Sequence, residues 1–134
     1  MKVFVLEDDP SRIEIIKRNF GKFGEFIFAI NIWEAKEKFN FNENYNLILL
    51  DHDLGGQIYV DSLEENTGAE FCRWIIQNKP KLPQIIVHSH NSVGSEIMAE
   101  YLEDYEVLRI PFGNLMKMWD KGILNFLGHY KYDS

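Results

Sequence analysis

Two short stretches decide the fold: VFVLEDD at residues 3–9 and LILLDHD at residues 47–53. Each begins with four apolar residues, the pattern of a strand buried on both faces, and runs directly into acids. Open α/β sheets bind ligands at the carboxyl ends of parallel strands. If these strands are neighbours, Glu7, Asp8 and Asp51 meet in one crevice. Gathered negative charge is costly unless a cation neutralises it, so the stretches predict a divalent metal, most simply Mg²⁺, beside phosphate.

The remaining sequence alternates between strand-like and helix-like segments. Strands are expected at residues 2–7, 26–29, 47–50, 84–87 and 106–110. Helix starts are expected at the capping residues Asp9, Asn31 and Thr67, and the spacing of Leu115, Trp119, Ile123 and Phe126 predicts a final helix. The pattern predicts a flavodoxin-like α/β fold, with a doubly wound five-stranded parallel sheet of order 2-1-3-4-5 and helices on both faces.

The composition argues against several classes of function. The chain has 134 residues, of which 46% are hydrophobic, enough for one domain with a core. A net charge of −7 argues against binding a nucleic-acid duplex through a basic face. The single Cys72 fits a reducing cytoplasm and falls in an apolar helical stripe, where a core role is expected. No stretch resembles a membrane span or a signal peptide, so we expect a cytoplasmic protein.

Asp51 has two possible chemical roles. It can attack a phosphoryl group and become an aspartyl phosphate, or it can hold a metal or the attacking water of a hydrolase. Asp9 is interpreted as a helix cap in preference to a metal ligand. The predicted metal ligands are therefore Glu7, Asp8 and Asp51, and Asp53 is a secondary candidate for the site.

Histidines near the predicted crevice suggest acid–base chemistry. His52 and His88 are candidate catalytic residues, because a leaving alkoxide needs a proton and histidine titrates near neutral pH. Either one alone is as well explained by a hydrogen bond to a loop carbonyl. His90 is a weaker candidate, because it alternates in direction with His88 and is expected to point away. His129 is expected at the surface.

Polar and glycine residues offer phosphate contacts. Ser89 and Asn91 can donate hydrogen bonds to phosphate oxygens, and Gly94 would let backbone N–H groups approach an anion. Ordinary helix capping by Asn91 or Ser92 is the alternative. The long polar loop at residues 52–66 contains two consecutive glycines, which predict either a mobile lid or a simple turn.

On these residues the chain resembles a receiver domain of two-component signalling. Receivers carry an acidic pair after the first strand, here residues 7–8, an accepting aspartate after the third, here Asp51, and a Ser or Thr after the fourth, here Ser89. They end the fifth strand with Lys-Pro, whereas Ile110 precedes the proline in this chain. Arg109 is one residue away and is expected to point to the other face of the sheet.

Two longer strings resemble a divergent branch, the cyclic-phosphate processing receiver domains. LDHDLG at residues 50–55 and HSHNSVG at residues 88–94 match that family's LDHDLG and HS-x-N-x-x-G strings, and Trp74 matches a tryptophan in its next helix. The family also lacks the receiver lysine. The resemblance implies a single receiver-like domain over residues 1–134. It further implies a phosphoesterase that uses Mg²⁺ or Mn²⁺ to act on a small phosphorylated molecule, such as a cyclic nucleotide or another cyclic phosphate.

Two alternative functions remain open at this point. One is a signalling receiver phosphorylated on Asp51, to which the missing lysine is the main objection. The other is a pseudo-receiver that binds only a protein partner, with Met116 and Met118 of the last helix as a contact surface. Core packing is the simpler account of those methionines.

Overall fold

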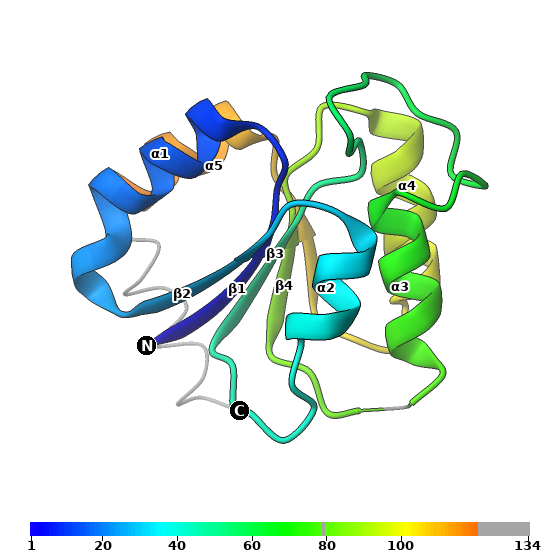
Figure 1. The fold of residues 1–134 in the computed structure, drawn as a ribbon, viewed down its shortest axis with the longest axis horizontal. Helices are drawn as coiled ribbons and strands as arrows, with labels where there is room; N and C mark the ends of the chain where they lie inside the picture. The colour runs from blue at the N-terminus through cyan, green and yellow to red at the C-terminus, as the bar shows by residue number, and fades with distance from the viewer. Residues whose placement is uncertain (79, 121–134) are drawn as a thin grey trace.

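The computed structural model describes residues 1–78 and 80–120, which form a five-stranded parallel sheet (Figure 1). The strands are β1 (Lys2–Leu6), β2 (Glu25–Ala29), β3 (Leu47–Leu50), β4 (Gln84–Val87) and β5 (Val107–Arg109). Their order is β2-β1-β3-β4-β5, which confirms the flavodoxin-like order predicted from the sequence. Leu6 pairs with Leu50, and Leu50 with Val87. The residues that follow β1, β3 and β4 therefore leave the sheet at the same level.

Helices connect successive strands and cover both faces of the sheet. They are α1 (Pro10–Phe20), α2 (Ile32–Lys38), α3 (Gly68–Ile76), α4 (Ser92–Tyr101) and α5 (Phe112–Asp120), with a short 3₁₀ turn, η1 (Gly21–Phe23), after α1. The predicted caps are confirmed, because the side chains of Asp9, Asn31 and Thr67 each accept a backbone N–H of the first helical turn. Of the predicted final helix, Ile123 and Phe126 lie outside the described residues, as does His129.

Figure 1 shows α1 and α5 on one face of the sheet and α2, α3 and α4 on the other. Alternate strand residues supply the two cores. Phe4 and Leu50 pack with α2, α3 and α4, whereas Val5 and Leu49 pack with α1 and α5. Because both faces are covered, residues 3–6 of β1 and all four residues of β3 are apolar, which is why these stretches show no polar alternation.

Three side chains for which the sequence predicted a core or surface role are described by the structure. Cys72 is fully buried in the larger core, and burial raises the pKa of its thiol, so a core role is confirmed. Met116 packs against the core on the α1 and α5 side, while Met118 is exposed. None of the helices within residues 1–78 and 80–120 has the length and hydropathy of a membrane span.

Candidate functional site

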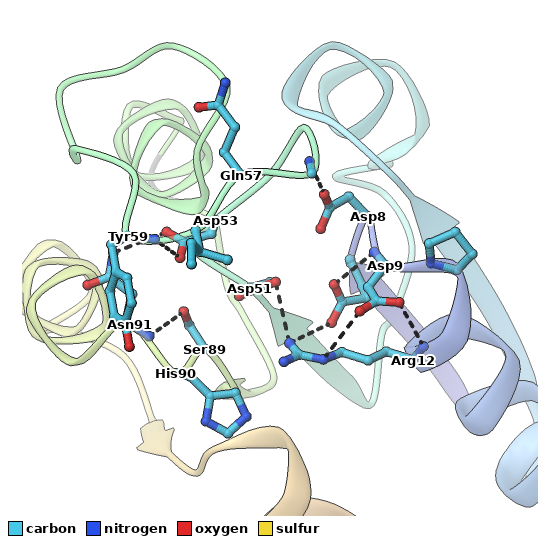
Figure 2. Close-up of a pocket in the computed structure, with 14 residues that line it drawn as sticks. Asp8, Asp9, Arg12, Asp51, Asp53, Gln57, Tyr59, Ser89, His90 and Asn91 are labelled. Atoms are coloured by element: carbon cyan, nitrogen blue, oxygen red, sulfur yellow. Dashed lines mark hydrogen bonds and ion pairs between the residues drawn. The ribbon is translucent and has the colours of Figure 1, made fainter.

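The carboxyl ends of β1, β3 and β4 open into a crevice of about 340 Å³ (Figure 2). Five carboxylates line it, from Glu7, Asp8, Asp9, Asp51 and Asp53. Part of the long loop, residues 56–59, also lines the crevice, together with residues 89–91 after β4. The volume lies within the range of small-molecule sites and exceeds what a phosphoryl group alone requires.

Glu7 is the deepest acid of the crevice. Its side chain is fully buried, and its Oε1 lies 3.0 Å from Nε2 of the equally buried His88. Its Oε2 accepts the backbone N–H of Asp9 at 3.2 Å. Burial alone would raise the pKa of Glu7, but the hydrogen bond and charge of His88, the Asp9 N–H and Arg12 outweigh it and lower the pKa to about 2. Glu7 is therefore a buried carboxylate that stays charged.

Asp51 follows β3 beside Glu7 and behaves in the opposite way. Its side chain is almost fully buried, and its Oδ1 accepts the backbone N–H of His52 at 2.8 Å. Burial raises the pKa of Asp51 to about 7, and the nearby Glu7 charge adds to this effect against the lowering influence of His88. Glu7 is therefore charged at neutral pH. The charged form of Asp51 is disfavoured by burial unless a cation is close.

The potential metal ligands that lie closest together in the structure differ in part from the predicted set of Glu7, Asp8 and Asp51. Ligand atoms of Glu7, Asp51 and His88 lie within 4.8 Å of one another. Asp8 also lines the crevice (Figure 2), but its Oδ2 accepts the backbone N–H of Gly56 at 2.6 Å. Burial raises the pKa of Asp8 as well. Three carboxylates facing one crevice, two of them with raised pKa values, are a donor set that fits a hard divalent cation.

Sequence reasoning missed Arg12, whose guanidinium lies among these acids. Its Nη1 is 3.5 Å from Glu7 Oε1 and 3.8 Å from Asp51 Oδ2, and its Nε is 4.0 Å from Asp9 Oδ2. Arg12 stands in the first turn of α1, where side chains lean back toward the helix start. A basic residue three positions after the capping Asp9 was therefore the signal available in the sequence.

The two histidines expected to flank the crevice do not line it. His88 and His52 are both fully buried beneath it. The His88 backbone N–H donates to Leu50 O, so His88 continues the strand ladder and its ring packs under Glu7. The expectation that His90 points away is wrong, because His90 lines the crevice (Figure 2). Strand alternation no longer applies at His90, since β4 has already ended at Val87.

His52 holds the start of the long loop. Its Nδ1 is 2.8 Å from Asp53 Oδ1, and its Nε2 is 2.9 Å from the Ser62 hydroxyl. Helix α4 closes over the ring at Gly94, where an added Cβ would come within 2.7 Å of ring atoms. The glycine of the HS-x-N-x-x-G string therefore makes room for His52, a packing role that differs from the anion contact expected for it.

Asp53 and Asn91 are tied into the same network. The Asp53 carboxylate accepts the backbone N–H groups of Tyr59 at 2.7 Å and Val60 at 3.1 Å, and the Asn91 amide at 3.0 Å. The Asn91 Oδ1 caps α4 by accepting the Gly94 N–H at 2.9 Å, which confirms the capping alternative. Both ends of the Asn91 side chain are thus engaged, although the residue lines the crevice.

Ser89 and Tyr59 also line the crevice. Ser89 is nearly buried at the crevice, and its hydroxyl oxygen accepts the Asn91 N–H at 3.0 Å, which leaves the hydroxyl hydrogen free to donate. Tyr59 and the adjoining Ile58 are 73% and 79% exposed. Tyr59 has φ = 52°, an unfavourable conformation for a bulky residue, and its N–H is held by Asp53. The network therefore presents an exposed aromatic ring at the rim.

The end of β5 supplies no cation to the crevice. Ile110 packs against the core on the α1 and α5 side, and Arg109 points to the start of α4, where it donates to Ser92 O at 2.9 Å. Among the crevice-lining side chains in the described part of the chain, Arg12 alone carries a permanent positive charge.

The strand order, the acids after β1 and β3 and the serine after β4 define a receiver domain of the response-regulator type. Residues 1–104 match the family model for the cyclic-phosphate processing receiver domain, and the chain belongs to this family.

Solved receiver structures are similar in fold. The response regulator TrrA from Thermotoga maritima, in complex with Mg(2+)-BeF, is 28% identical over 90% of this chain and 96% of its own, with a TM-score of 0.58. The receiver domain of the Francisella response regulator 1452 is 20% identical, covers 99% and 98% of the two chains, and has a TM-score of 0.64. A CheY-like receiver from Methanospirillum hungatei is 17% identical with the same coverage and TM-score. No curated protein sequence matches the chain.

Proposed function

We propose that this receiver domain hydrolyses a small cyclic phosphate in the crevice, with Mg²⁺ or Mn²⁺ held by Glu7, Asp8 and Asp51. The observation that carries the proposal is the crevice itself, which has a volume of about 340 Å³ and is lined by carboxylates. A crevice of this volume has room for the organic part of a ligand as well as for its phosphate. The rim residues Ile58 and Tyr59 offer apolar surface for the organic part of a ligand.

The metal assignment rests on the charges of the acids. Burial raises the pKa of Asp51 to about 7, so a cation at this position would relieve a real electrostatic cost. The TrrA receiver was solved in complex with Mg(2+)-BeF, which supports a metal and phosphate site of the same kind here. When bound, such a metal polarises the phosphate and orients the attacking water.

In this proposal the chain's own residues transfer protons and bind the phosphate. Asp51, kept charged by the cation, takes a proton from the attacking water as the new P–O bond forms. The ring P–O bond breaks, and the leaving alkoxide receives a proton from His90, the histidine that lines the crevice. Ser89 donates its hydroxyl hydrogen to a phosphate oxygen. The product is an open phosphate monoester.

The other two histidines act in this proposal as positioning residues. His88 holds Glu7 in its charged form through the 3.0 Å contact, and His52 holds Asp53 through the 2.8 Å contact. Asn91 works beside them, because its amide joins Asp53 to the start of α4. All three would support the reacting groups without touching the substrate.

The test is turnover of a panel of cyclic phosphates by the purified chain with Mg²⁺ or Mn²⁺. The panel contains cyclic nucleotides with five- and six-membered phosphate rings and the corresponding ribose cyclic phosphates. Asp51→Asn should abolish turnover, while the exposed Asp104→Asn, which removes the same charge away from the crevice, should leave it unchanged. No turnover on any compound, with metal demonstrably bound, would reject the proposal.

A second candidate function is phosphorylation of Asp51 as in a signalling receiver. The position of Asp51 after β3 and Ser89 after β4 favours it. The replacement of the receiver lysine by the partly buried Ile110 weighs against it. Its signature is a mass increase of one phosphoryl group on incubation with a small phosphodonor, lost in Asp51→Asn. A third candidate, a pseudo-receiver that binds only a protein, has the exposed Met118 in its favour.

A further inference from the structure

The proposed site has one source of fixed positive charge and five carboxylates. In the portion of the chain that the structure describes, Arg12 is the only Lys or Arg side chain lining the crevice. A phosphate anion approaching these acids would meet strong repulsion without a cation beside it. The position that supplies a lysine in other receivers holds Ile110, which packs into the core. A protein side chain that adds positive charge beside the phosphate must therefore come from another element.

The guanidinium of Arg12 is placed to provide it. Its Nη1 lies 3.5 Å from Glu7 Oε1 and 3.8 Å from Asp51 Oδ2. Charge-assisted hydrogen bonds of this kind are usually about 2.7–2.9 Å long, so neither acid holds Arg12 tightly. Its side chain is 24% exposed and reaches into the crevice beside Asp51, as Figure 2 shows. With its Nε also 4.0 Å from Asp9 Oδ2, Arg12 is shared among three acids and is still accessible to a ligand.

An aromatic ring from α5 supports the guanidinium. Arg12 Cζ lies 5.1 Å from the centre of the Phe112 ring, within the range of a cation–π contact. Phe112 is nearly buried at the start of α5, and its backbone N–H donates to His88 O at 3.0 Å. The ring is therefore anchored to the chain segment that also carries His88, directly below the crevice.

We propose that Arg12 is the phosphate-contacting cation of this site, and that Phe112 is its positioning residue. In the metal-free protein Arg12 neutralises part of the charge of Glu7 and Asp51. When a divalent cation binds those acids, the guanidinium turns its planar fork of N–H donors to the phosphate oxygens. Arg12 consequently opposes binding of the metal alone and favours binding of phosphate. This inference rests on the proposed function only in placing a phosphate in the crevice.

The first arm of the test measures Mg²⁺ alone. The full chain is titrated with Mg²⁺ and followed by amide chemical shifts in two-dimensional NMR spectra, which also report whether each variant is folded. Arg12→Gln removes the competing charge and should bind Mg²⁺ at least about threefold more tightly. Arg18→Gln is the matched control, because Arg18 is an exposed arginine farther along α1 and should leave the affinity unchanged.

The second arm measures inorganic phosphate at saturating Mg²⁺. Arg12→Gln should weaken phosphate binding about tenfold, as expected for the loss of charge-assisted hydrogen bonds, and Arg18→Gln should not. Arg12→Lys keeps the charge without the planar fork, so its phosphate affinity should fall between the two while its Mg²⁺ affinity stays near wild type. Phe112→Leu should weaken phosphate binding several-fold with little change in Mg²⁺ affinity.

Opposite changes in the two affinities are the signature of this role, because a merely structural arginine would move both in the same direction. Phosphate binding that is unchanged in Arg12→Gln, or weaker Mg²⁺ binding, overturns the inference. If Arg12→Gln does not fold, unchanged phosphate binding in Arg12→Lys overturns it. If the wild-type chain binds phosphate through Arg12 but turns over no cyclic phosphate, the proposed hydrolysis fails while the role of Arg12 stands.

Discussion

His88 Nε2 lies 3.0 Å from Glu7 Oε1, and neither side chain is exposed to solvent. An ionised carboxylate without a partner would not be stable at this depth. The contact therefore explains how the crevice keeps a permanent negative charge at its floor. It also gives His88, a member of the family's HS-x-N-x-x-G string, a role that does not require access to the substrate.

Replacing His88 with leucine should leave Glu7 buried and without its main partner. We expect the free energy of unfolding to fall by about 3 kcal/mol, measured by urea denaturation at pH 7. His90→Leu, at an exposed position two residues away, should change it by less than about 0.5 kcal/mol. The double variant Glu7→Leu/His88→Leu should recover part of the loss. A loss below about 1 kcal/mol in His88→Leu would contradict this account of the pair.

The stability of the metal-free chain should depend on pH through Asp51. Its pKa rises from an ordinary 3.8 to about 7 in the folded protein. Between these values the folded protein keeps a proton that the unfolded chain has released, so the free energy of unfolding falls as pH rises from about 4 to 7, by on the order of 2–4 kcal/mol. Thermal unfolding in EDTA across this range checks the sign. Asp51→Asn should remove the dependence and be more stable than wild type at pH 8.

Glu7 contributes the opposite trend at lower pH. Its pKa falls from an ordinary 4.5 to about 2, so the stability it adds is present above pH 4.5 and is lost as pH falls toward 2.

Added Mg²⁺ should flatten the decline in the free energy of unfolding between pH 4 and 7, because the cation favours charged Asp51. A metal-free chain whose stability rises steadily from pH 5 to pH 8 would contradict the burial argument.

Gly68 should not tolerate a methyl group. An added Cβ would lie 2.0 Å from the Asp51 carbonyl oxygen, which is backbone and cannot turn aside. We expect Gly68→Ala to cost more than about 2 kcal/mol of unfolding free energy and to weaken Mg²⁺ binding by displacing the Asp51 segment. Gly113→Ala is the matched control, since within the described residues an added Cβ meets no atom within 4 Å beyond its chain neighbours and its own helix backbone, and alanine favours the helix. Equal effects of the two substitutions would rule out the close approach of α3 to β3.

Tyr59 should matter for ligands with an organic part and not for phosphate itself. Tyr59→Ala should weaken binding of a cyclic nucleotide about tenfold, because stacking on an aromatic ring contributes about 1–3 kcal/mol per base. Its affinity for inorganic phosphate should be unchanged. Phe23→Ala, an exposed ring on η1 that does not line the crevice, serves as the control. Calorimetric titration with both ligands separates the two effects. Equal losses for both ligands would show that Tyr59 acts through the loop and not through stacking.

The sheet and the acids at its edge could be predicted because their causes are local. Strands buried on both faces require continuous apolar runs, and parallel order brings Glu7 and Asp51 to one edge. The caps at Asp9 and Thr67 follow from side chains that bond to the next turn. The strands and caps depend on few residues that are close in the chain, and the parallel strand order then brings the acids together.

The directions of side chains beyond the strand ends could not be predicted in the same way. His88 continues the β4 ladder, but His90 lies beyond the regular strand. The alternation of side chains along a strand therefore did not predict that His90 lines the crevice. The burial of His52 depends on Ser62 and on α4 packing at Gly94, both distant in sequence. The position of Arg12 depends on Phe112, one hundred residues away. Tertiary contacts of this kind have no signature in a local pattern.

The central claim is that Asp51 serves hydrolysis and not storage of a phosphoryl group. The most direct measurement incubates the chain with Mn²⁺ and the cyclic phosphate panel, and follows product formation and the intact mass of the protein in the same samples. The account predicts many turnovers per protein, dependence on Mn²⁺ and on Asp51, and no lasting increase in mass. A stable increase of one phosphoryl group with a small phosphodonor, together with no turnover of any cyclic phosphate, would contradict it.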